Sequence, residues 1–223
     1  MRKRNNSPVI IVSALNCFAL MLFMGTLTPA NAVSLTAVLD SSQEVAPAGS
    51  TNSPLTGSAQ LTLTQSNSAF SLSFMIMLDS GFDFKNFGAP NPLGGETVSA
   101  LHFHNQDRGF NGPVAFGIFG PSSDVDGDTM ANVNANGTTT VTGEWDQTEG
   151  NGGATLTDFL PALLTAQAGQ DVPLYLNLHT ENDPSGAIRG QVSAVPEPGT
   201  LLLLGSGLLG LWGYRQFRPT SYK

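Results

Sequence analysis

The stretch LHFHNQDRGFNGPVAFGIF, residues Leu101–Phe119, contains two of the three histidines of this 223-residue chain. Successive side chains of a strand point to opposite faces, so His102 and His104 would share one face and the apolar residues beside them the other. On a helix the two rings would lie about 200° apart. Glycines and asparagines then supply a turn, and a second apolar run follows. We therefore expect a β-hairpin here.

Short alternating runs continue on both sides of this hairpin, and Asn67 is expected in a turn between two of them. The predicted strands are Ser34–Asp40, Gly57–Thr64, Ala69–Leu78, Thr97–Asn105, Pro113–Phe119, Thr138–Trp145, Pro173–Thr180 and Ala187–Ser193. About eight strands with one short helix predict an all-β fold, either an antiparallel β-sandwich or a Greek-key barrel.

The one expected helix lies between the sixth and seventh strands. Thr157 or Asp158 would cap its start and Gly169 would close it. Two segments, Ser80–Glu96 and Pro121–Gly137, are rich in turn-forming residues and predict long loops. Loops of this length are usually functional or mobile.

The N-terminus predicts a signal peptide over residues 1–32. Basic residues at positions 2–4 precede the apolar run Val9–Met24, and the tripeptide ANA at positions 30–32 fits a cleavage site. Cys17, the single cysteine, lies within this segment, which leaves a lipoprotein anchor as the alternative. Removal of the segment would leave a chain without thiols, and so without disulfides or cysteine-bound metals.

The C-terminus combines a short polar motif, an apolar run and a basic end. The residues are Pro196, Glu197 and Pro198, then Leu201–Tyr214, then Arg215 and Arg218. The apolar run is shorter than the roughly 20 residues of a spanning helix, and the basic end favours a cytoplasmic terminus. This order resembles the PEP-CTERM sorting signal. The resemblance implies an exosortase-type sorting enzyme as partner, transient membrane anchoring and delivery to the cell surface or matrix, with a permanent inner-membrane anchor as the alternative.

The segment between the two signals, 33–194, is of a suitable size for one domain. It contains three basic and 16 acidic residues, which gives a net charge of −13. Nucleic acid needs clustered Lys and Arg, so this charge argues against it as a partner. Divalent cations, cationic partners or solubility alone fit the charge better.

Four stretches of this segment together resemble the CHRD domain, which is named after chordin and common in bacterial exported proteins. The stretches are LTAVLDSSQEVAP (35–47), LHFHNQDRGFNGPVAFGIF (101–119), TLTDFLPALLTAQAG (155–169) and YLNLHTENDPSGAIRGQV (175–192). The resemblance covers about Ser34–Ser193. It implies an all-β extracytoplasmic domain and, for bacterial members, no assigned molecular role.

The third histidine, His179, lies near the end of a predicted strand. If that strand neighbours the one with His102 and His104, the three rings would converge. Carboxylates expected close by are Asp107, Glu181 and Asp183. Three histidines suit zinc or copper, which leaves a metal-binding or superoxide-dismutase-like redox protein as the alternative function. The other interpretation is that each ring only hydrogen-bonds loop backbone.

The segment SDVDGDTMANVN alternates Asp124, Asp126 and Asp128 in the manner of calcium ligands. Thr129 and Ala135 stand where an EF-hand requires Gly and Glu, so an EF-hand is excluded. A calcium-binding loop and a solvated acidic turn both stay open.

Sequence motifs of the common enzyme classes are absent from the chain. It has no Gly-x-Ser-x-Gly elbow, no P-loop and no Gly-x-Gly-x-x-Gly after a strand. We therefore expect a non-enzymatic surface or matrix protein that binds envelope or matrix polymers or proteins. No cofactor is expected beyond a possible Zn, Cu or Ca ion.

Overall fold

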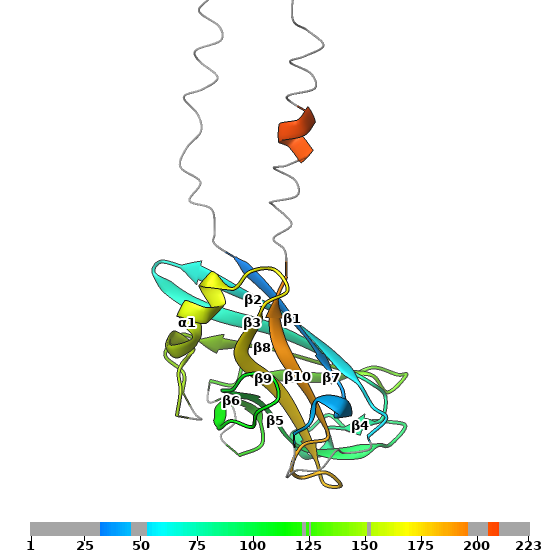
Figure 1. Cartoon of the computed structure of the whole chain (residues 1–223). Coiled ribbons are helices and arrows are strands. Elements are labelled where there is room, and N and C mark those ends of the chain that lie inside the picture. Colours follow the sequence, from blue (N-terminus) through cyan, green and yellow to red (C-terminus); the bar gives the residue numbers. More distant parts are fainter. Residues whose placement is uncertain are drawn as a thin grey trace, which may run out of the picture. The chain divides into compact units, whose positions relative to one another are not determined.

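The structure of the chain is a computed structural model, and it describes residues 32–45, 53–121, 124, 126–150, 153–195 and 205–209 (Figure 1). The predicted signal peptide lies outside the described residues, apart from residue 32. The sorting residues Pro196, Glu197, Pro198, Arg215 and Arg218 also lie outside them. None of the helices in the described part of the chain is long and apolar enough to cross a membrane.

The described part of 32–195 folds mainly into strands. They are β1 (Val33–Leu39), β2 (Gly57–Ser66), β3 (Ala69–Leu78), β4 (Phe82–Asp83), β5 (Glu96–His104), β6 (Val114–Phe119), β7 (Met130–Val133), β8 (Thr139–Asp146), β9 (Asp171–Thr180) and β10 (Ile188–Ala194). The helices are α1 (Leu156–Thr165) and two 3-10 turns, η1 (Ser41–Gln43) and η2 (Lys85–Phe87). This confirms the all-β prediction, and all eight predicted strands are present.

The ten strands form one curled sheet that resembles half of a barrel (Figure 1). Their order is β4-β5-β9-β10-β1-β2-β3-β8-β7, and β6, which lies outside this order, pairs with the second half of β5. All pairings are antiparallel except the short one between β4 and β5. The predicted histidine hairpin is confirmed as β5 and β6.

The β2–β3 hairpin shows how local sequence sets strand register. Asn67 and Ser68 have φ values of 47° and 72°, and two consecutive positive φ values match the right-handed twist of the strands. The pairing then runs without a break from Ser66↔Ala69 to Gly57↔Leu78. The prediction of a turn at Asn67 is confirmed.

The segments predicted as long loops contain β4, η2 and β7, and part of the first is packed into the core. Phe82 and Phe84 have no exposed surface. Phe82 lies on β4, which pairs in parallel with the start of β5 at Phe82↔Glu96. The alternation of two phenylalanines was a local signal for this strand, but turn-forming residues on both sides obscured it.

The N-cap of helix α1 lies two residues before Thr157 and three before Asp158, the two expected caps. Thr155 is its N-cap, and Asp158 instead occupies the third helical position, where its carboxylate accepts from the Thr155 backbone N–H at 2.8 Å. The helix ends at Thr165 with Ala166 as its C-cap, rather than at Gly169. The N–H of Gly169 donates to the Ala194 carbonyl at 2.7 Å, so this glycine ties the loop to the sheet.

One face of the sheet is apolar and α1 packs against it. The Trp145 ring stacks on Phe116 with centroids 5.0 Å apart, and Phe159 of α1 approaches it to 5.5 Å. Most side chains of β5, β9 and β10 that point the other way are polar, and most of these are buried. This second face positions the candidate site.

Candidate functional site

The site is a buried polar face on β5, β9 and β10. Directly paired residues of antiparallel strands point to the same side of the sheet. The register pairs His104 with Tyr175 and Tyr175 with Gln191, so these three side chains share one face. We call these seven side chains the polar face: His102, His104, Tyr175, Asn177, His179, Arg189 and Gln191. The loop 105–113 and η1 contribute hydrogen-bond partners to it.

Arg189 lies at the centre of the polar face with 1% of its surface exposed. Its guanidinium carbon lies 3.5 Å from the centroid of the Tyr175 ring, a cation–π arrangement. Its N–H groups donate to the Asn111 side-chain oxygen and the Asp107 carbonyl, each at 3.3 Å. Burial lowers the pKa of Arg189, yet an arginine keeps its charge in proteins.

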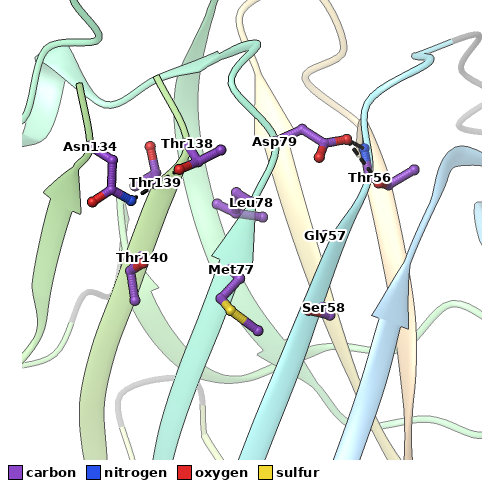
Figure 2. A pocket seen from close by; sticks show the side chains of 10 residues that line it. All are labelled: Thr56, Gly57, Ser58, Met77, Leu78, Asp79, Asn134, Thr138, Thr139 and Thr140. Carbon is purple, nitrogen blue, oxygen red and sulfur yellow. Dashed lines mark hydrogen bonds between the residues drawn. The ribbon is translucent and has the colours of Figure 1, made fainter. Parts of the chain in front are cut away.

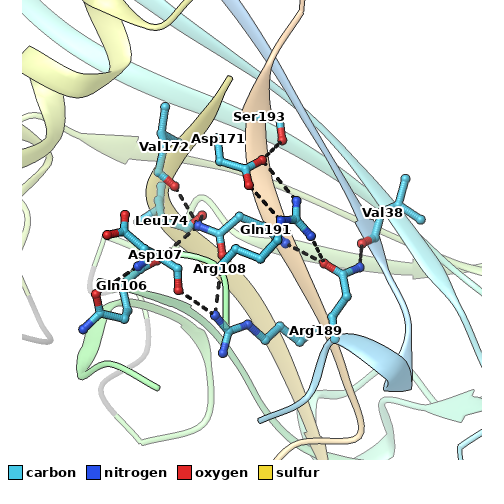
Figure 3. A network of polar contacts seen from close by, with 11 residues as sticks. Val38, Gln106, Asp107, Arg108, Asp171, Val172, Leu174, Arg189, Gln191 and Ser193 are labelled. Carbon is cyan, nitrogen blue, oxygen red and sulfur yellow. Dashed lines mark hydrogen bonds and ion pairs between the residues drawn. The ribbon is translucent and has the colours of Figure 1, made fainter. Parts of the chain in front are cut away.

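Gln191 links the loop 105–113 to the sheet (Figure 3). Its amide nitrogen lies 2.7 Å from the Val172 carbonyl and 3.1 Å from that of Gln106. Beside it, Arg108 forms an ion pair with Asp171 at 2.7 Å on the surface of the protein. These contacts hold the loop over the polar face.

The three histidines converge because β9, which contains His179, pairs with β5, which was the condition stated for their convergence. The centroid of His102 lies 5.6 Å from that of His104 and 5.3 Å from that of His179. One ring nitrogen from each lies within 4.8 Å of the other two. The acidic residues expected nearby, Asp107, Glu181 and Asp183, are not members of this group.

Backbone carbonyls fix the tautomer of two of these rings. His104 donates from Nδ1 to the Gly112 carbonyl at 3.0 Å, and His179 donates from Nδ1 to the Pro184 carbonyl at 3.1 Å. A neutral imidazole with a proton on Nδ1 has a lone pair on Nε2. Both Nε2 atoms are buried without a hydrogen-bond partner among the described residues. The nitrogens of His102 are also buried, and the Pro121 backbone lies near enough to raise the pKa of this ring slightly, against the larger effect of burial.

The environment keeps the rings uncharged at neutral pH. Burial, followed by the neighbouring His179 and His104, lowers the pKa of His102 to about 4. Burial also lowers the pKa of His104 to about 4, although its bond to the Gly112 carbonyl acts in the opposite direction. Burial lowers the pKa of His179 as well. Neutral imidazoles are the form that binds metal ions.

Sequence reasoning missed Arg189, Gln191 and Glu44 as site residues. Burial raises the pKa of Glu44 to about 7, against the opposing charge of Arg189. One of its carboxylate oxygens is buried without a partner among the described residues. The spacing of Arg189 and Gln191 predicts a shared face, but nothing local shows that this face is covered.

The predicted calcium residues Asp124, Asp126 and Asp128 lie together, with one oxygen of each within 4.8 Å of the others. Asp126 also groups with Asp146 and Glu149. Burial, supplemented by the charges of Asp124 and Asp126, raises the pKa of Asp128 to about 6 and that of Glu149 to about 7. Such clusters are also common on acidic surfaces, so calcium binding stays a prediction.

A separate pocket of about 410 Å³ lies across the ends of β2, β3 and β8 (Figure 2). It is lined by Thr56, Gly57, Ser58, Met77, Leu78, Asp79, Asn134, Thr138, Thr139 and Thr140. The Asp79 carboxylate accepts from both the backbone N–H and the hydroxyl of Thr56, at 2.7 and 2.8 Å. The one carboxylate of the pocket is already hydrogen-bonded, so the lining residues do not indicate a particular ligand or reaction.

Comparison with protein families matches two segments of the chain. Residues 35–192, more than two thirds of the sequence, match the CHRD domain. Residues 194–218 match the PEP-CTERM protein-sorting motif. Searches of curated proteins and of solved structures found no match.

The chain therefore belongs to the CHRD domain family and has a PEP-CTERM sorting motif directly behind the domain. This confirms both resemblances noted in the sequence. The motif implies an exported, extracytoplasmic protein that an exosortase-type enzyme processes. These matches favour a sorted, exported protein over the alternative function of a metal-binding or superoxide-dismutase-like redox protein.

Proposed function

We propose that the chain is a non-enzymatic protein of the cell surface or extracellular matrix, and that its sorting motif delivers the CHRD domain there. The observation that carries this proposal is the order of the two matched segments. The domain match ends at residue 192 and the motif begins at residue 194. An apolar, basic-ended tail directly behind an exported domain is suited to transient anchoring during sorting.

The geometry of the domain's ends supports this proposal. β10 ends at Ala194, which pairs with Leu35 of β1. The next residue, Val195, donates its N–H to the Ser34 carbonyl at 2.9 Å. All ten strands of the described domain therefore precede the tail. A processing enzyme could remove the tail without removing any strand.

The acidic composition of the domain limits the kinds of partner that it can bind. With a net charge of −13 over 33–194, the domain would repel phosphate backbones and anionic lipid surfaces. The partners we propose are envelope or matrix polymers or proteins that present cationic groups. Before processing, the tail would hold the chain at the inner membrane.

Deletion of Pro196, Glu197 and Pro198 tests the sorting role. We expect the variant to remain at the inner membrane with its apolar tail attached, because the processing enzyme loses its recognition element. Cell fractionation and the mass of the protein give the readout. A matched deletion of residues 219–221, outside the motif, should leave sorting unchanged. Normal surface delivery of the first variant would contradict the proposal.

A further inference from the structure

We propose that His102, His104 and His179 together bind one zinc or copper(II) ion through their ring nitrogens. The site lies inside the β-domain and does not depend on the sorting tail. Neither family match assigns it.

The distances between the rings fit a single ion. One nitrogen from each ring lies within 4.8 Å of the other two. In a tetrahedral site with metal–nitrogen distances of about 2.0–2.1 Å, ligand nitrogens lie about 3.3 Å apart. Small side-chain rotations close the difference. The rings come from neighbouring strands β5 and β9, so the backbone already holds them at this spacing.

The hydrogen bonds prepare two of the rings for a metal. His104 and His179 each donate Nδ1–H to a backbone carbonyl, which directs an Nε2 lone pair into the cluster. Histidine ligands of metals typically donate their second nitrogen in this way. Both Nε2 atoms are buried and have no hydrogen-bond partner among the described residues. A bound ion would satisfy them.

The ring of His104 is held in place from its other side. It stacks on Tyr175 with centroids 4.8 Å apart and an interplanar angle of 8°. Arg189 covers the Tyr175 ring in turn. A ligand that is locked by stacking loses little freedom when an ion binds, so the stack favours binding.

The ligand set selects the class of metal. The group contains three neutral imidazoles and no carboxylate. Zinc and copper(II) favour nitrogen ligands, whereas calcium and magnesium favour oxygen. Three histidines leave a fourth position for water on a tetrahedral ion. The His179 side chain is partly exposed and offers a route for the ion.

Metal content is the direct test. The full chain, with Cys17→Ser to remove its thiol and without a polyhistidine tag, is purified in mild detergent and stripped with chelator. It is then loaded with zinc chloride and desalted. We expect about one zinc per chain, lost in His102→Ala and in His179→Ala, because a site of this kind needs all its ligands. Asp126→Asn disrupts the acidic cluster and should retain the zinc.

A spectroscopic measurement on the unsubstituted histidines covers the case in which the alanine variants do not fold. Copper(II) bound to the same protein should show nitrogen couplings from imidazoles in its paramagnetic resonance spectrum. A copper spectrum with oxygen ligands alone would overturn the proposal. So would a protein that stays free of zinc in excess metal, or zinc that is lost in Asp126→Asn and kept in His102→Ala. In those cases buried water, or nothing, lies between the rings.

Discussion

At the scale of single residues, Arg189 shows how a cation can lie inside a β-domain. Its guanidinium stacks on Tyr175, and its hydrogen bonds go to neutral oxygens of Asn111, Asp107 and Gln191. A buried charge is tolerated when its donors are bonded. The planar guanidinium of arginine can stack on a ring and donate several hydrogen bonds in different directions. A lysine ammonium cannot stack in this way and has fewer donors at a single point.

We predict that Arg189→Lys lowers the free energy of unfolding by about 2 kcal/mol, because the lost bonds and stacking leave buried acceptors unpaired. Urea unfolding measures the loss. Arg108→Lys is the matched control. Its ion pair with Asp171 is about half exposed, and such pairs contribute less than about 1 kcal/mol. Equal losses in the two variants would mean that the position of Arg189 has no special role.

Glu44 gives a prediction about pH. Its pKa is raised to about 7 from the ordinary 4.5, chiefly by burial. Between these two values the folded protein keeps a proton that the unfolded chain has lost, so this group makes the fold less stable as pH rises. Glu44→Gln removes that dependence. The free energy of unfolding of this variant, minus that of the parent protein, should therefore increase from pH 5 to pH 8. We expect an increase of about 1 kcal/mol, because solvent screens a partly exposed group.

The measurement is the difference between the two unfolding free energies at each pH. The histidines titrate in both proteins, so their contribution cancels. A difference that stays constant over this range would show that Glu44 titrates normally.

At the scale of elements, the loop 105–113 gives β5 its covered polar face. The Gly112 carbonyl accepts from His104, and the Gly112 N–H donates to the Tyr175 hydroxyl at 3.2 Å. A β-carbon at Gly112 would lie 2.0 Å from the Asn105 carbonyl oxygen. The absence of a side chain therefore lets the loop close tightly enough to reach both rings.

We predict that Gly112→Ala destabilises the domain by about 2–3 kcal/mol, because the loop must move off the polar face and leave buried groups unpaired. Gly109→Ala is the control in the same loop. Gly109 has a φ of +85° and open space around it, so only backbone strain of about 1 kcal/mol is expected. Thermal unfolding of both variants provides the comparison. A smaller loss at Gly112 than at Gly109 would contradict this account.

At the scale of the whole domain, the last strand joins two parts of the sheet. β10 lies between β9 and β1, so it connects β5 and β9 with the strands that begin the chain. β10 is also the last strand in the described part of the chain, so the sheet is incomplete without it. The sorting motif begins where this strand ends.

We predict that truncation after Val195 changes the free energy of unfolding by less than about 0.5 kcal/mol, because no strand is removed. Truncation after Ala187 removes β10 and should prevent folding. Circular dichroism and urea unfolding distinguish the two outcomes. A tail-less chain that fails to fold would show that the tail is part of the domain.

Local sequence determined eight of the ten strands of the described domain, the turn at Asn67 and the faces of alternating side chains. The alternation in β5 placed His102 and His104 on one side, because the period of a strand is two whatever its neighbours are. Asn67 predicted its turn, because few residues tolerate positive φ. The sorting motif and the CHRD stretches were also recognisable as strings of residues.

Only the tertiary structure decided which strands are neighbours and what covers them. Pairing of β5 with β9 joins residues far apart in the sequence, as in Phe103↔Leu176, which are 73 positions apart, through backbone hydrogen bonds that any sequence can form. That pairing brings His179 to His102. The burial of Arg189 depends on the loop 105–113 folding over it, and a charged residue in a strand otherwise predicts exposure. Side-chain direction is a local property, whereas burial depends on contacts between distant parts of the chain.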